Sequence, residues 1–437
     1  MTYPRHATRG GSQLVQNDRK RRAIPPLAAL TVFAALALLY LFGSFTTYQH
    51  TLGSVGVRVW PWPYLDTDTV LSAVRCLRDG VDVYAANPCD PEMRSYGYSP
   101  LWMLLAHLPV TEAWIPWIGT IFALLFIAAL WLLPAARNRD SLLLILLGLI
   151  SAATILAVER GNNDLVNFAL VASMAALMGR SAGARLAGYG LGLVAGMLKF
   201  YPLLVMASAL REKPARFFRI AAASVVIVGV AAAVTWHDLS RALAIIPTGS
   251  PFYEMFGAPN LGQGLAIIFN RPASFAGGLR IVLTLGAIAL GVRYGLRAST
   301  ARAVAALTER ERNFLLIGAL MVIGCFMTSQ NIAYRTINLL LVLPSLTALR
   351  VVDAPRPMKA MAWVAILLLW EELIYRWIVV FADLTGERTS KAIELSLAWL
   401  PRELGWWWIV TMLIACAAAI VRPMAMGQWA LGPAKAA

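Results

Sequence analysis

The sequence predicts an all-α protein that crosses a membrane several times. Of its 437 residues, 59% are hydrophobic and 14% are charged, and the mean hydropathy is +0.66. This composition excludes a soluble enzyme of this size. Apolar runs of about 17 to 25 residues recur between positions 26 and 421, and each is long enough to cross a hydrocarbon layer as a helix. The sequence lacks the alternating segments typical of an outer-membrane barrel.

We expect a basic cytoplasmic tail over 1–25 and a first membrane helix over 26–46. The length of that first run, and the lack of a small-residue cleavage site, favour a retained helix over a signal peptide. Further membrane helices are expected at 112–134, 140–158, 164–180, 184–198, 200–211, 217–235, 277–297, 313–328, 334–350, 359–381 and 404–422, before a second cytoplasmic tail over 423–437. Residues 26–422 would then form a single membrane domain of about twelve helices.

Basic residues indicate which loops face the cytoplasm. With the N-terminus inside, most Lys and Arg fall in short loops on that side, among them Arg211, Lys213, Arg216 and Arg219, as the positive-inside rule expects. The net charge of +15 therefore indicates membrane orientation, and no nucleic-acid partner is expected. Three longer outer loops, 47–110, 236–276 and 382–403, lie on the opposite side. We expect the chemistry there.

The first outer loop contains an acidic pair, Asp66 and Asp68, about twenty residues past the end of the first expected membrane helix. A carboxylate just outside a membrane span can remove a proton from a substrate hydroxyl. On an extended segment, two acids at this spacing could exchange roles with little rearrangement. An amphipathic stretch over 68–78 follows, and an apolar hairpin over 99–108 is expected to lie along the membrane surface.

Cys76 and Cys89 lie in the same loop. A disulfide fits an oxidising periplasm, and two free thiols fit the sequence equally well. The few histidines and cysteines show no metal-ligand spacing, so no metal site is expected. No nucleotide-binding loop occurs either. We expect no cofactor, while dependence on a divalent cation stays open.

Two polar motifs join expected membrane helices on the outer side. The first is the segment from Glu159 to Asp164, Glu-Arg-Gly-Asn-Asn-Asp. Its Gly and Asn are typical of a turn, but Glu159, Arg160 and Asp164 together indicate a polar cavity or mutual pairing. The second is Lys-Phe-Tyr-Pro, beginning at Lys199. Lys199 either extends to the membrane surface from a helix end or binds a lipid phosphate.

Two further motifs and one charged group complete the set. Asn260-Leu261-Gly262-Gln263-Gly264 has glycines that permit close approach to a ligand. Gln330-Asn331-Ile332-Ala333-Tyr334-Arg335 places Arg335 where it can hold an anionic group. Glu371, Glu372 and Arg376 interrupt an apolar run; Glu372 and Arg376 could pair within the bundle, or the three could line a substrate cleft.

The expected outer face combines carboxylates with cations, among them Lys199, Arg280 and Arg335. Nucleotide donors are not expected outside the cell, so a reaction there needs a substrate that is already activated. A sugar linked to a lipid phosphate meets this need. Its tail lies in the bilayer, its phosphate meets the cations, and a carboxylate deprotonates the acceptor hydroxyl.

At these positions the chain resembles the GT-C membrane glycosyltransferases and, among them, glycosyltransferase family 87. That family includes mycobacterial phosphatidylinositol-mannoside mannosyltransferases and related arabinofuranosyltransferases. The resemblance rests on short motifs in a matching order: Asp66 with Arg75, Gly80, Asp82 and Tyr84; Cys89-Asp90-Pro91; Tyr98-Ser99-Pro100; Glu159-Arg160-Gly161-Asn162 with Asp164; Lys199-Phe200-Tyr201-Pro202; and Asn331 with Tyr334-Arg335.

The resemblance implies a GT-C type fold and an inverting transfer of a sugar, with mannose expected, from a polyprenyl-phosphate donor to a glycolipid or glycan acceptor. It implies Asp66 as the base, with Asp68 as its rival, and a donor phosphate held by Arg335 with Lys199 or Arg280. The residues expected to contact the donor or acceptor sugar are Glu159, Arg160, Asn162, Asp164, Tyr201, Asn260, Gln263, Asn331 and Tyr334.

The corresponding location is the inner membrane of a bacterium, with the active site facing the periplasm and membrane lipids around the bundle. Two alternatives stay open. A flippase for lipid-linked oligosaccharides would use its charged residues as a pathway across the membrane. A glycan polymerase or ligase would share the outer-face site.

Overall fold

The computed structural model describes residues 9–246 and 248–429. Helix makes up 77% of the chain. The β structure of the described part is one antiparallel pair of two-residue strands, β1 (Met255–Phe256) and β2 (Asn331–Ile332). The expected all-α class is therefore confirmed.

The first half of the chain contains α1 (Arg9–Phe42), α2 (Phe45–Ser54), α3 (Leu65–Arg78), η1 (Pro100–His107), η2 (Glu112–Trp114), α4 (Ile115–Leu130), α5 (Arg139–Leu149), α6 (Ala152–Glu159), α7 (Asp164–Leu177), α8 (Ala182–Lys199), η3 (Tyr201–Arg211) and α9 (Pro214–Val234). The second half contains α10 (Trp236–Ala244), α11 (Ala258–Ile268), α12 (Ala273–Gly295), α13 (Ala298–Ala305), α14 (Glu309–Thr328), η4 (Ala333–Asn338), α15 (Leu339–Leu349), α16 (Arg356–Leu369), α17 (Glu371–Ala382), η5 (Asp383–Thr385), α18 (Glu387–Ile393), the π-helical turn η6 (Glu394–Trp399) and α19 (Leu400–Trp429).

Six helices of the described chain are long and apolar enough to cross a membrane. They cover 21–42, 112–130, 214–234, 273–295, 309–328 and 389–422. The pair α5 and α6, bent by 43°, adds a seventh crossing if the two form one span. A membrane protein with several spans is thus supported, but the expected count of about twelve is not confirmed. The other expected spans are shorter, broken or less apolar helices.

Several expected boundaries differ from the structure. The run 359–381 is broken at Trp370, which separates α16 from α17. The expected outer loop 382–403 is mainly helical and leads directly into α19; it has no glycine or proline between 387 and 400 to stop a helix. The expected tail over 423–437 begins as a continuation of α19, and 430–437 lie outside the described residues.

The expected first outer loop contains regular helices. Its expected amphipathic stretch is the helix α3, and its expected hairpin is the 3₁₀ helix η1. Ser99 caps η1 by accepting a hydrogen bond from Leu101 N, and Pro100 occupies the first turn, where no amide is needed. Buried side chains of α3 and η1, including Val74 and Met103, form a small separate core.

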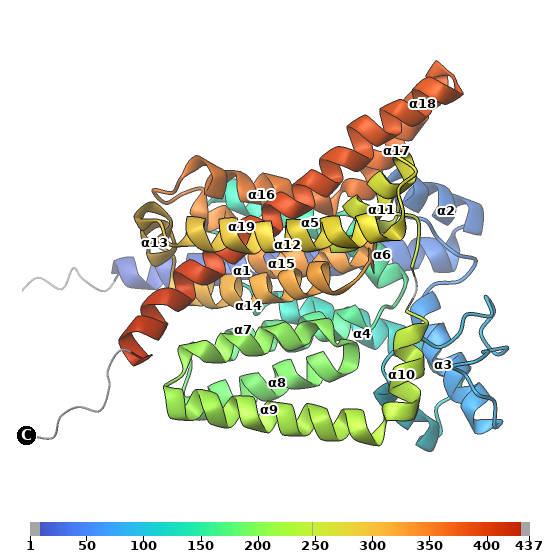
Figure 1. Cartoon of the computed structure of the whole chain (residues 1–437), viewed down its shortest axis with the longest axis horizontal. Helices are drawn as coiled ribbons and strands as arrows, with labels where there is room; N and C mark the ends of the chain where they lie inside the picture. The colour runs from blue at the N-terminus through green and yellow to red at the C-terminus, as the bar shows by residue number, and fades with distance from the viewer. Residues whose placement is uncertain (1–8, 247, 430–437) are drawn as a thin grey trace, which may run out of the picture.

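The long helices lie side by side along the longest axis of the molecule, and α2, α3 and α10 gather at one end (Figure 1). Helix α14 is largely enclosed, whereas α9 and α12 expose most of their apolar side chains. An apolar helix that faces outward in this way is suited to contact lipid. The candidate site lies at the end that carries α3.

Candidate functional site

The corner between α6 and α7 packs directly against the start of α3. Asp66 N donates to Arg160 O at 3.0 Å, and Thr67 Oγ1 donates to Gly161 O at 2.7 Å. Gly161 has a φ of 55°, and a Cβ at this position would lie 2.7 Å from Thr67 Oγ1. Glycine is therefore required both by the left-handed backbone and by the close approach. These contacts fix Asp66 against the polar corner.

Asn162 links Asp66 to the rest of the site. Its Nδ2 donates to Asp66 Oδ2 at 2.6 Å, and its Oδ1 accepts from Lys199 Nζ at 3.0 Å and from Asp164 N at 2.8 Å. Arg160 Nη1 lies 3.8 Å from the other Asp66 oxygen. Both ends of the amide are thus engaged, which orients its side chain.

Asp164 is the centre of the arrangement, and its side chain is fully buried. Its Oδ2 accepts from Lys199 Nζ at 2.6 Å and from Arg335 Nε at 3.2 Å, and its Oδ1 accepts from Tyr201 OH at 2.8 Å. As the first residue of α7, Asp164 also lies where the helix dipole favours a negative charge. One carboxylate therefore holds two cations together.

A strained turn brings Lys199 and Tyr201 to the same carboxylate. Phe200 lies between them with a φ of 56°, a left-handed conformation that a bulky residue rarely adopts. The turn ends α8 after Lys199 and starts η3 at Tyr201. Strain of this kind persists only where the surroundings enforce it. Here the bonds of Lys199 and Tyr201 to Asp164 do so.

Arg335 completes the site from η4. Its Nη1 donates to Asn331 Oδ1 at 2.6 Å, and its guanidinium lies over the Tyr201 ring at 5.7 Å. Within the described chain, its Nη2 makes no hydrogen bond. Lys199 Nζ lies over the Tyr334 ring at 5.8 Å. We call the connected group the polar cluster: Asp66, Arg160, Asn162, Asp164, Lys199, Tyr201, Asn331, Tyr334 and Arg335.

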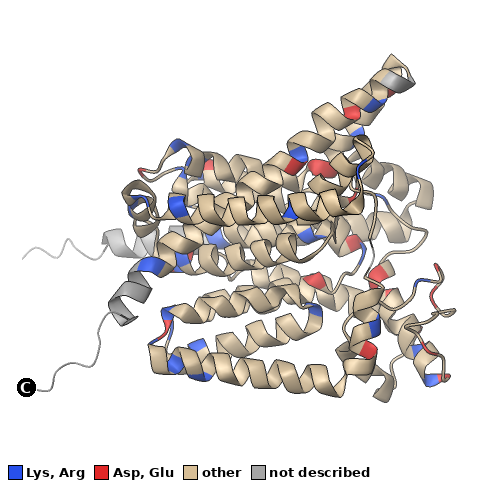
Figure 2. Cartoon of the chain, viewed as in Figure 1, with Lys and Arg blue, Asp and Glu red and all other residues tan. Residues whose placement is uncertain are grey.

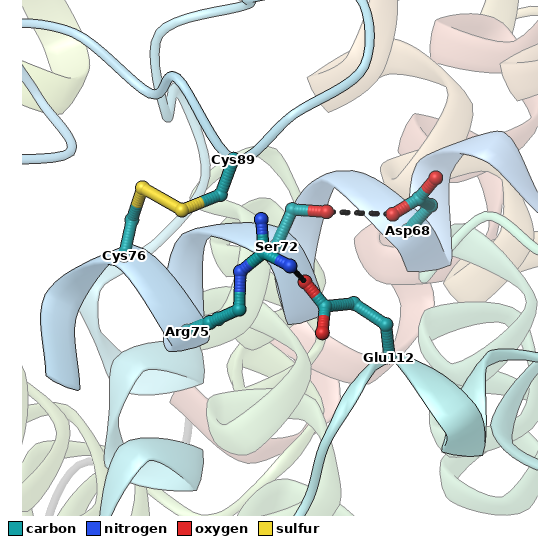
Figure 3. The surroundings of a disulfide bond; sticks show 6 residues. All are labelled: Asp68, Ser72, Arg75, Cys76, Cys89 and Glu112. Atoms are coloured by element: carbon teal, nitrogen blue, oxygen red, sulfur yellow. Dashed lines mark hydrogen bonds and ion pairs between the residues drawn. A yellow bond between two sulfur atoms is a disulfide. The ribbon is translucent and has the colours of Figure 1, made fainter. Parts of the chain in front are cut away.

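Asp68 makes no hydrogen bond to this cluster within the described part of the chain. Its Oδ1 accepts from Ser72 Oγ at 2.6 Å (Figure 3). Both acids lie in the first turn of α3, not on an extended segment. Residues two apart on a helix point in different directions, so the extended segment that was expected to let Asp66 and Asp68 exchange roles is absent. Which of the two acids is the base stays a prediction. Burial raises the pKa of Asp68, and the hydrogen bond from Ser72 acts against this.

Cys76 and Cys89 form a disulfide that ties the end of α3 to the following loop (Figure 3). On the same helix, Arg75 pairs with Glu112 at 2.9 Å. This ion pair joins α3 to the first residue of η2, which leads into α4. The disulfide holds α3 against its own loop, and the ion pair holds it beside a candidate membrane helix.

Three expected site residues lie elsewhere. Arg280 donates to the carbonyl oxygens of Met327 and Thr328 at 2.8 and 3.2 Å, and not to the polar cluster. Asn260 donates to Met255 O and accepts from Gln330, and so supports the backbone near β1. The half-buried Gln263 lies on the same helix, α11. The structure therefore does not bring these residues to Asp66.

An apolar cavity of about 760 Å³ lies beside the cluster, between α1, α2, α4 and α6. Its lining includes Phe33, Leu52, Ile127 and Tyr64, and Glu159 lies at its polar edge. The Glu159 side chain is buried, and neither of its oxygens has a hydrogen-bond partner among the described residues. A buried carboxylate without donors is unfavourable. A ligand with hydroxyl groups would satisfy it.

A second cavity, of about 890 Å³, lies on the other side of α2 and is lined by polar and aromatic side chains. Trp60, Tyr253, Glu372 and Arg376 belong to its wall. No ion pair joins Glu372 to Arg376 in the described part of the chain, so the expected pair on one helix face is absent. Glu371 instead accepts from Trp406 Nε1 at 3.0 Å.

The sequence analysis did not predict two residues that contact the site, Tyr98 and Asn338. Tyr98 lies 5.5 Å from Lys199 Nζ, and Asn338 donates to Tyr201 OH at 3.3 Å. The signal for Asn338 was its position three residues after Arg335, which places both on one face of a helical segment. Within the described residues, no three His, Cys, Asp or Glu side chains gather closely enough to hold a metal ion.

Comparison of the chain with protein-family models, with curated proteins and with solved structures found no match. The function is therefore argued from the geometry of the site.

Proposed function

We propose that the protein is an integral-membrane glycosyltransferase. It transfers a sugar, with mannose expected, from a polyprenyl-phosphate donor to a glycolipid or glycan acceptor on the extracytoplasmic face, with inversion at the anomeric carbon. The observation that carries the proposal is that the polar cluster adjoins the apolar cavity through Glu159, the chain neighbour of Arg160. A carboxylate, two cations and room for a lipid tail therefore occur close together.

Asp66 is the proposed base. One oxygen accepts from Asn162, while the other lies 3.8 Å from Arg160 Nη1 and accepts no hydrogen bond within the described chain. That second oxygen can take the proton of an acceptor hydroxyl. The acceptor oxygen then forms a bond to the anomeric carbon, and the bond from that carbon to the phosphate oxygen breaks. The polyprenyl phosphate leaves with the electron pair.

Lys199 and Arg335 are the proposed partners of the leaving phosphate. They share one carboxylate, Asp164, so the pair retains one surplus positive charge. Lys199 uses two of its three donors within the cluster, and Arg335 Nη2, which makes no hydrogen bond to the described residues, can donate to a phosphate oxygen. Fixed donors of this kind stabilise charge that develops on a leaving group.

In this proposal the lipid tail of the donor occupies the apolar cavity, and Glu159 accepts hydrogen bonds from the hydroxyl groups of its sugar. The wall of the cavity is formed largely by hydrocarbon and aromatic side chains of α1, α2, α4 and α6. Glu159 at the edge lacks hydrogen-bond donors, and sugar hydroxyls supply them. A substrate that is lipid at one end and hydroxyl-rich at the other thus satisfies both features.

The test is a transfer assay with membranes containing the full chain, defined polyprenyl-phosphate sugars and glycolipid acceptors. Asp66→Asn should lower transfer by about 10²- to 10⁴-fold, the range for loss of a general base. The fold should be kept, because the amide oxygen of the new side chain can still accept from Asn162. Asp68→Asn is the matched control and should retain most activity. Full activity of Asp66→Asn would overturn the assignment. Loss of transfer activity with Asp68→Asn alone would identify Asp68 as the base instead.

The same assay separates the alternatives. A flippase moves the donor across the membrane but forms no new glycosidic bond. A polymerase or ligase forms bonds only with long lipid-linked glycans. Transfer of a single sugar to a defined acceptor is the result that the proposal requires.

A further inference from the structure

A pocket with an excess of positive charge lies far from the polar cluster. Its volume is about 530 Å³, and it is lined by Arg185, Arg211, Glu212, Lys213, Ala215, Arg216 and Arg219. We call it the basic pocket. Arg185 and Lys199 lie near opposite ends of α8, roughly 20 Å apart along the helix axis. Figure 2 shows Lys and Arg gathered at the end of the bundle where α8 and α9 begin.

One carboxylate balances only part of this charge. Glu212 is buried and accepts from Arg185 at 2.7 Å, from Arg216 at 3.2 Å and from Tyr189 at 3.3 Å. The acceptors of Glu212 are thus engaged. A second acid, Glu309, also acts on Arg185.

The remaining cations lack an acidic partner. Arg211 donates to the neutral side chain of Asn313 at 2.8 Å. Arg219 donates to a carbonyl of its own helix, that of Ala215, at 3.2 Å. Lys213 is exposed, and its side chain makes no hydrogen bond or ion pair within the described chain. Three positive charges around one concavity therefore remain to be balanced by an anion.

The position of the pocket identifies the kind of anion. It lies at the start of α9, the most outward-facing of the candidate spans, with 6% of its most apolar stretch buried. Phe218 and Val225 on this helix are 60% and 72% exposed. The basic pocket therefore lies where charged side chains meet a lipid-contacting helix. A ligand with an anionic head and apolar chains matches both surfaces, whereas a free anion matches only the first.

We propose that the basic pocket binds the phosphate head group of an anionic phospholipid, with the acyl chains along α9. The positive-inside distribution of charge explains basic loops, but it does not require that they surround a concavity beside a lipid-facing helix. Basic pockets between membrane helices are suited to such head groups. This proposal is independent of the proposed transferase activity.

The test measures lipid binding to the purified full chain in neutral detergent, by native mass spectrometry with added phosphatidylglycerol. The variant Lys213→Gln/Arg219→Gln removes two exposed cations of the pocket. Each cation near an anionic lipid contributes about fivefold in affinity, so we expect binding about 25-fold weaker. The matched control, Arg293→Gln/Arg302→Gln, removes two exposed arginines outside the pocket and should bind within twofold of the parent chain.

Phosphatidylcholine and inorganic phosphate complete the design. The proposal requires that phosphatidylcholine bind more weakly than phosphatidylglycerol, and that millimolar inorganic phosphate leave the bound lipid in place. Equal losses in the two double variants, or equal binding of the two lipids, would overturn it. Displacement of the lipid by inorganic phosphate would instead make the pocket a site for a free anion, and would overturn it equally.

Discussion

Removal of the Asp164 carboxylate should destabilise the fold strongly. Asp164→Ala leaves Lys199 and Arg335 buried without their shared counter-ion and Tyr201 without its acceptor. Breaking a buried ion pair from one side costs about 3–5 kcal/mol. Because the carboxylate is fully buried, solvent screening does not reduce this value. We therefore expect the free energy of unfolding to fall by about 3–5 kcal/mol.

The assay is reversible unfolding in mixed micelles with increasing denaturing detergent, followed by tryptophan fluorescence. A double-mutant cycle isolates the interaction free energy between Asp164 and Lys199. Asp164→Asn and Lys199→Met should each destabilise the chain, and the double variant should cost about 1–3 kcal/mol less than their sum, as expected for groups in direct contact. A loss below about 1 kcal/mol for Asp164→Ala, or additive effects in the cycle, would show that the cluster is not formed as described.

Three further predictions concern α3 and its surroundings. Gly161→Ala should lower the free energy of unfolding by at least about 1 kcal/mol, because the new Cβ strains a left-handed backbone and meets Thr67; an unchanged thermal unfolding midpoint would contradict it. Replacement of both Cys76 and Cys89 by Ser should destabilise the outer loop by roughly 3 kcal/mol, because the unfolded chain regains the entropy that closing a loop with a sequence separation of 13 removes, and limited proteolysis should cleave this loop faster than in the parent chain. Burial raises the pKa of Asp68 above its ordinary 3.8, so the folded chain binds this proton more tightly than the unfolded chain; stability should fall as pH rises from about 4 through the raised pKa, and Asp68→Asn, followed by thermal unfolding from pH 4 to 7, should remove that part of the pH dependence.

Much of the polar cluster could be predicted from the sequence because hydropathy and basic loops determine the depth of each segment. Lys199, Asp164 and Arg335 lie far apart in the chain, yet each follows or precedes an apolar run on the same expected side. That assignment alone brings their helix ends to one face of the bundle. Asn162 then lies between them because it belongs to the short corner before α7.

Direction around a helix axis could not be predicted in the same way. Arg280 lies in the first turns of α12, near the expected outer end of that span, but its side chain bonds to carbonyl oxygens at the end of α14. Asp66 and Asp68 share one expected segment, yet the helical start of α3 separates their directions. The composition of a segment predicts its depth in the membrane. The direction of a side chain around its helix depends on packing against particular neighbours, which a single sequence does not specify.

The broken helices have a similar cause. Trp370 lies within an apolar run that is long enough for one span, yet the chain changes course there. Its Nε1 donates to Leu147 O at 3.0 Å, and Glu371 next to it bonds to Trp406. These partners lie 223 and 35 residues away in the chain. Because partners so distant in the chain hold the break, the sequence around Trp370 contains no glycine or proline that would have predicted it.

The amide of Asn162 has a consequence for the whole site. Its nitrogen holds Asp66 while its oxygen holds Lys199, and a flipped amide would turn both attractions into repulsions. In the proposed reaction, a phosphate that draws Lys199 away would loosen the amide and so change the position of the base. Binding of the donor and binding of the acceptor would then be coupled, and each would change the affinity for the other by the same factor.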